Sequence, residues 1–151
     1  MQRVLQFMCW LFLTSLTTTF VHAELGAASL TQSHSAWVKS SNALTSPKPV
    51  IYSIQKIITQ DEIEVHEYLN ATGLVFGLAW AGESKPNMSS MLGSFAGRYQ
   101  FALSQPPSAR APVAINTPDF VVQTGGRMNH FFGVAFLPTL APQGVSLEDI
   151  K

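Results

Sequence analysis

The chain has 151 residues, of which 46% are hydrophobic and 12% are charged, and its nine basic and nine acidic side chains leave no formal net charge. This balance is typical of a globular protein of about one domain. The cations are also scattered along the chain, so no basic field exists to attract nucleic acid or an anionic membrane surface, and we expect no nucleic-acid partner.

The first 23 residues have the pattern of a secretory signal peptide. Arg3 precedes an apolar stretch over residues 4–16, and Val21-His22-Ala23 has the pattern of a cleavage site that ends in a small residue. We therefore expect cleavage after Ala23, a periplasmic or secreted location, and contact with the membrane only during export. An N-terminal membrane anchor is the alternative, but the apolar stretch is shorter than the ~20 residues that a spanning helix needs.

The only cysteine, Cys9, lies inside the predicted signal peptide. The mature chain would therefore be free of cysteine and could form neither a disulfide nor a cysteine-ligated metal site. Residues 24–49 are rich in Ser, Ala and Thr and predict a loose N-terminal arm. The remaining residues, 50–151, predict a single domain.

Three strands are predicted at the start of this domain. In residues 50–60 and 63–70, successive side chains sort into two alternating faces. Both runs contain β-branched side chains, and these features are typical of strands. Asn70-Ala71-Thr72-Gly73 predicts a hairpin turn, because Gly73 can adopt a positive φ angle. The chain would then return as a third strand over residues 74–81.

A helix and a second hairpin are predicted to follow. Pro86 suits a first helical turn, and apolar residues recur at three- and four-residue spacing over 88–102. Residues 119–138 predict two strands separated by a turn at 124–126. The order β-β-β-α-β-β indicates an α+β fold, with a mostly antiparallel sheet of about five strands and one helix packed on one face.

The third and last predicted strands each alternate between small and large residues. One face carries Val75, Gly77 and Ala79 of the third strand and Phe131, Gly133 and Ala135 of the last strand, and it is small in the middle. Small side chains let a helix approach closely, so we expect the helix on that face. The bulky face would then need cover from the arm, from another chain or from an apolar ligand. We predict a ligand or partner face made of Phe76, Trp80, Arg127, His130, Phe132 and Phe136.

No catalytic constellation is predicted. Glu64 and His66 share a strand face, but a metal site would need His130 to converge on them across the sheet, and isolated histidines on strands are more often structural. We expect no metal and no cofactor. Glu62, Glu64 and Glu67 are expected to be solvated acidic residues. Arg127 stands at a strand entrance, where a guanidinium can clamp a carboxylate from the chain or from a ligand.

Several runs of residues resemble one family. They are Ala23-Glu24-Leu25-Gly26, VHEYLNATGLVFGLAWAG, Pro86-Asn87 followed by MLGSF, GGRMNHFFGVAFLP and PQGVSLEDI. Together they resemble the small exported bacterial proteins of the DUF2844 family. The chain departs from the family pattern at Gly82-Glu83 and at Asn87, where a Gly-Pro pair and an Asp would be expected. The resemblance implies a Gram-negative periplasmic setting, and it implies no established activity and no catalytic residues.

These observations favour an exported, non-catalytic accessory or binding protein over an enzyme. Its partner would be another protein or a second copy of the chain, engaged through a sheet edge or the apolar face. A carrier of a small apolar ligand on the aromatic face is the first alternative. An enzyme built on His66, His130, Glu64 and Arg127 is the second.

Overall fold

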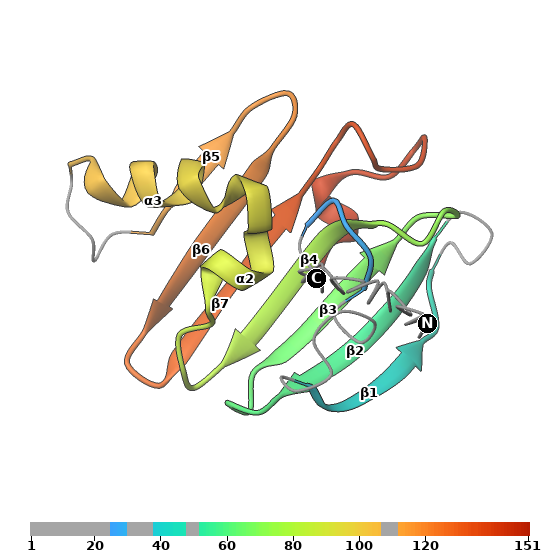
Figure 1. Cartoon of the computed structure of the whole chain (residues 1–151), viewed down its shortest axis with the longest axis horizontal. Helices are drawn as coiled ribbons and strands as arrows, with labels where there is room; N and C mark the ends of the chain where they lie inside the picture. Colours follow the sequence, from blue (N-terminus) through green and yellow to red (C-terminus); the bar gives the residue numbers. More distant parts are fainter. Residues whose placement is uncertain (1–24, 30–37, 48–51, 107–111) are drawn as a thin grey trace, which may run out of the picture.

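The computed structural model describes residues 25–29, 38–47, 52–106 and 112–151 (Figure 1). The predicted signal peptide lies outside these residues. Among the residues described, no helix has the length and the apolar character needed to cross a membrane.

The described residues form one antiparallel sheet of seven strands with a helical segment across one face (Figure 1). The strand order is β1-β2-β3-β4-β7-β6-β5. The strands are β1 (Val38–Leu44), β2 (Ser53–Thr59), β3 (Glu64–Leu69), β4 (Val75–Gly82), β5 (Ala114–Asn116), β6 (Val121–Arg127) and β7 (His130–Phe136). The α+β class and the antiparallel pairing are confirmed, whereas the predicted number of about five strands is wrong.

The two additional strands lie at the edges of the sheet. β1 comes from the segment predicted as a loose arm, and six of its seven residues are exposed, so it lacks the apolar alternation that marks a half-buried strand. β5 has only three residues and pairs with β6. Neither strand buries enough apolar surface to leave a pattern in the sequence.

The predicted helix is present but broken. It consists of α2 (Met88–Leu92), the 3₁₀ turn η1 (Gly93–Phe95) and α3 (Ala96–Ser104). Asn87 caps α2, because its side-chain oxygen accepts a hydrogen bond from the Ser90 N–H at 3.2 Å. Gly93 ends α2 with a φ of 52°, a conformation that glycine adopts without steric cost. The helical segment runs across β4, β7 and β6 in Figure 1.

The turn at Asn70–Gly73 is confirmed, with a φ of 79° at Gly73 and the Asn70 side chain accepting from the Leu74 N–H at 3.0 Å. The second hairpin turns later than predicted. Its turn residues are Met128 and Asn129, between the paired Arg127 and His130, and Asn129 takes the positive φ of 61°.

The glycines at 125 and 126 lie inside β6 instead of forming the turn. Gly125 pairs with Phe132, whose ring covers it so closely that a Cβ added to Gly125 would lie 2.8 Å from the ring. Glycine here makes room for an aromatic ring on the neighbouring strand.

The helical segment covers what we call the inner face of the sheet, and it packs against Leu78 and Trp80. The prediction that it would pack on the small residues of β4 is therefore wrong. The reason is a register shift: Tyr68 pairs with Gly77 and Leu69 with Val75, which leaves Phe76 as an extra residue. The shift places Phe76 on the outer face, opposite Leu78 and Trp80.

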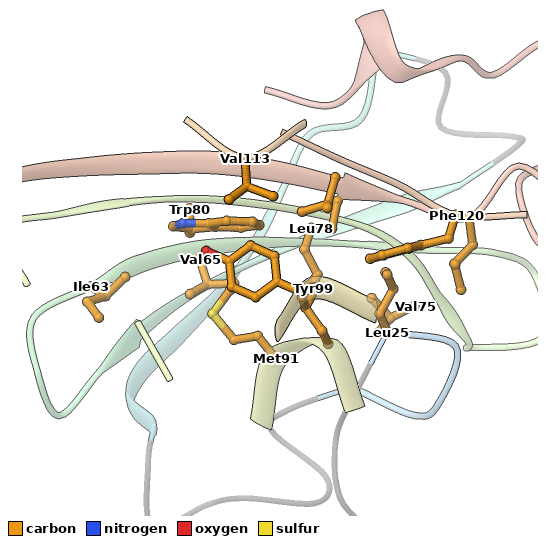
Figure 2. Close-up of a cluster of buried hydrophobic side chains, with 14 of the residues drawn as sticks. Leu25, Ile63, Val65, Val75, Leu78, Trp80, Met91, Tyr99, Val113 and Phe120 are labelled. Carbon is orange, nitrogen blue, oxygen red and sulfur yellow. The ribbon is translucent and has the colours of Figure 1, made fainter. Parts of the chain in front are cut away.

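Large residues of β4 instead face small residues of β7 on the inner side. Leu78 pairs with Ala135, and Trp80 pairs with Gly133. A Cβ on Gly133 would lie 2.4 Å from Trp80 Cζ2, so the indole occupies the space above that glycine. Figure 2 shows the indole ring between Val113 and Tyr99, with Met91 of α2 nearby. Bulky residues of β4 thus fit against small residues of β7 on the inner face, so the sheet does not have one small face and one bulky face.

Candidate functional site

The outer face of the sheet is covered over one half by the C-terminal segment, residues 137–151. Ile150 and the partly buried Leu140, Val145 and Leu147 pack there on a cluster of aromatic side chains, Tyr52, Tyr68, Phe76 and Phe136. A 3₁₀ turn, η2 (Leu147–Asp149), shapes this segment. Phe76 is therefore covered by the chain's own C-terminal segment, which was not among the covers expected from the sequence.

Hydrogen bonds fix the end of this segment to β3. The Tyr68 hydroxyl donates to the main-chain oxygen of Lys151 at 2.8 Å and accepts from the Lys151 N–H at 2.8 Å. Burial is the main cause that raises the pKa of Tyr68 above its usual value, so the hydroxyl keeps the proton that it donates. The segment is therefore held both by apolar packing and by a buried phenol.

The other half of the outer face is open and forms a trough of about 650 Å³ across β3, β4, β7 and β6. Its floor contains Ala79, Ala81 and Val134, whose side chains are too short to fill the space above the strands. Phe132, 48% exposed, stands beside Gly125 and adds an aromatic surface. The trough is thus a shallow apolar recess with a single exposed aromatic ring.

The polar rim of the trough lies on β3, next to the end of the C-terminal segment. Glu64 accepts from Lys56 Nζ at 2.6 Å and lies 2.9 Å from His66 Nε2, while His66 Nδ1 lies 3.0 Å from the main-chain oxygen of Lys151. The hydrogen bond from Lys56 is the largest cause that lowers the pKa of Glu64. Both ring nitrogens of His66 are therefore engaged with oxygen atoms of the chain. This rim ties β2, β3 and the C-terminal segment together.

The predicted site residues do not form one surface. Phe76 and Phe136 are buried beneath the C-terminal segment, and Trp80 is buried on the inner face. His130 and Phe132 are exposed on the outer side with ring centroids 5.7 Å apart, and the exposed Arg127 lies at the end of β6. Phe132 and Trp80 both line the outer trough, but only the Phe132 ring is exposed there. The structure does not place His130 with Glu64 and His66. Among the residues described, no three His, Cys, Asp or Glu side chains could jointly hold a metal ion.

One polar residue was misjudged from the sequence. Glu67 is 1% exposed, not solvated, and lies on the inner side of β3, where Ser29 donates a hydrogen bond to its carboxylate and Gln55 Oε1 lies 2.9 Å from the same hydroxyl. Glu67 shares a strand face with the apolar Val65 and Leu69, and this shared face was the signal that could have indicated burial.

Comparison with known proteins gives one match. Residues 21–150 match the family model described as "Protein of unknown function (DUF2844)". No curated protein and no solved structure matches the chain.

Proposed function

Because the chain belongs to the DUF2844 family, whose function is unknown, we propose a function from its surface: it is an exported, non-catalytic accessory protein that binds a partner on the open outer trough. The sequence of residues 1–23 supports export to the periplasm. The observation that carries the binding role is the trough itself, which is apolar and left open by the C-terminal segment.

The chemistry of the rim supports binding over catalysis. Glu64 and His66 are engaged with Lys56 and with the C-terminal segment, so their polar atoms serve intramolecular contacts. The floor of the trough offers methyl and main-chain groups. It suits an apolar side chain or a small apolar molecule, and a partner protein would present such a group.

The test places a photo-activated cross-linking amino acid at Ala81 in the trough, in cells that export the protein. The matched control carries it at Gly97, an exposed position on α3 where an added Cβ meets nothing within 4 Å. We expect a discrete cross-linked species from position 81 only, and its loss when Phe132→Ser removes the aromatic surface. Equal capture at both positions, or none at 81, would refute the proposal.

A carrier of a small apolar ligand remains the second candidate, favoured by the apolar lining of the trough. The purified protein would then bind a neutral apolar dye such as Nile red saturably, and Ala81→Trp would abolish binding by filling the recess. Partner capture at position 81 without dye binding would favour the accessory role over the carrier.

A further inference from the structure

The outer face of the sheet has the shape of a step. The C-terminal segment, residues 137–151, raises one half of this face, and the outer trough leaves the other half recessed. β7 crosses from one half to the other. Its Phe136 is buried beneath the C-terminal segment, whereas Phe132 and His130, on the same side of the strand, are exposed. A step of this kind fits against a second copy of itself across a two-fold axis that runs across the strands.

Both halves of the step leave apolar groups accessible to solvent. In the recessed half, Phe132 is exposed and the floor of the trough consists of short side chains. In the raised half, Val145 and Leu147 pack on the sheet but are only partly buried. A two-fold contact between two copies would therefore cover apolar surface on both halves, and each contact would be made twice.

The exposed charges of the two halves are opposite. Arg127 pairs with His130 at the open end of the recessed half, so both side chains lie on the outer side, and both are exposed. The raised half carries the exposed Glu148 in η2. The ion pairs in the described part of the chain use other residues than Arg127 and Glu148. The two-fold rotation brings the hairpin end of one copy over the raised half of the other, where these opposite charges attract.

We propose that the partner of the outer trough is a second copy of this chain, and that the C-terminal segment of each copy lies against the trough of the other. This inference rests on the function proposed above, because it names the partner of the same site. The Phe132 ring of each copy faces the short side chains of the opposite trough, and two pairs of Arg127 with Glu148 border the contact. A two-fold axis along the strands is excluded, because it would bring the two raised halves into collision.

Sedimentation velocity of the purified mature chain, over a series of concentrations, measures the association directly. We expect a species of twice the chain mass, and Phe132→Ser should weaken its formation because apolar surface is lost from both copies. Arg127→Glu and Glu148→Arg should each weaken it about tenfold, since each variant brings like charges together at two positions. An equimolar mixture of these two variants should associate as tightly as the parent chain, because both pairs in the mixed dimer again join opposite charges.

The matched control is Lys85→Glu, which reverses another exposed cation beside the same hairpin. Lys85 lies over the ring of Phe131, which is on the inner side because it precedes the outward-facing Phe132 in β7. This variant should leave the dimer unchanged. Circular dichroism verifies that every variant is folded.

The outcomes separate this inference from the function on which it rests. A parent chain that stays monomeric overturns the dimer, and a cross-link from position 81 to a different protein would then leave the accessory function standing. A monomeric chain with no cross-link at position 81 rejects both. A dimer that is insensitive to Phe132→Ser and Arg127→Glu, or a mixture of the two charge variants that does not recover association, rejects the two-fold contact through the outer face.

Discussion

Gly133→Ala tests the packing of Trp80 against β7. A Cβ at this position would lie 2.4 Å from Trp80 Cζ2 and 2.7 Å from the main-chain oxygen of Gln123. Trp80 is 5% exposed and packed in the inner core, and a main-chain oxygen cannot rotate away as a side-chain end could. Overpacking of a core costs about 1–3 kcal/mol, so we expect a loss near 3 kcal/mol in the free energy of unfolding.

The matched control is Gly97→Ala on α3, where an added Cβ meets nothing within 4 Å. Alanine is favoured over glycine in a helix, so this variant should gain about 0.5–1 kcal/mol. Urea unfolding followed by far-ultraviolet circular dichroism measures both changes. Adding Trp80→Leu to Gly133→Ala should restore part of the loss, because the two sites are coupled through direct contact. If Gly133→Ala is as stable as the parent chain, the described packing of the indole on β7 is incorrect.

Three further predictions follow from the fold and the sequence. Ile150→Ala should lower the free energy of unfolding by about 2–4 kcal/mol in urea titrations, because this buried side chain lies against Gly77, and an unchanged midpoint would mean that the C-terminal segment is not docked. Lys56→Met should raise the pKa of Glu64 in carboxyl NMR titrations, because the Lys56 hydrogen bond lowers it, and an unshifted titration would contradict the contact. The stability that this contact contributes is present above the unfolded-state pKa of Glu64 and is lost as pH falls through its folded-state pKa. Exported protein should begin at Glu24 by N-terminal sequencing, and retention of Met1 would reject the predicted signal peptide.

Local sequence patterns predicted the elements that bury one face or turn sharply. Apolar alternation located β2, β3 and β4, and Asn70 with Gly73 located the first turn, because these signals depend on near neighbours in the chain. Glycines at 125 and 126 were misleading for the second turn. Their role is to admit the Phe132 and Phe131 rings of the partner strand, which is a contact between strands.

The candidate sites were less accessible to sequence reasoning. Strict alternation assigned Phe76 and Trp80 to one face, but one extra residue in β4 reverses the alternation between them. The sequence suggested that Arg127 could bind a carboxylate. It did not predict the contact of Lys85 with Phe131, because this contact depends on how the loop before α2 lies over the hairpin.

The sequence by itself determined the class of fold, the antiparallel strand order through the first hairpin, the start of the helix and membership of the family, because short-range periodicity and residue type carry these features. Only the tertiary structure decided which face each aromatic residue occupies, that large residues of β4 meet small residues of β7, and that residues 137–151 cover Phe76. These features depend on strand register and on contacts between residues far apart in the chain, where burial and steric fit are collective properties of the folded sheet.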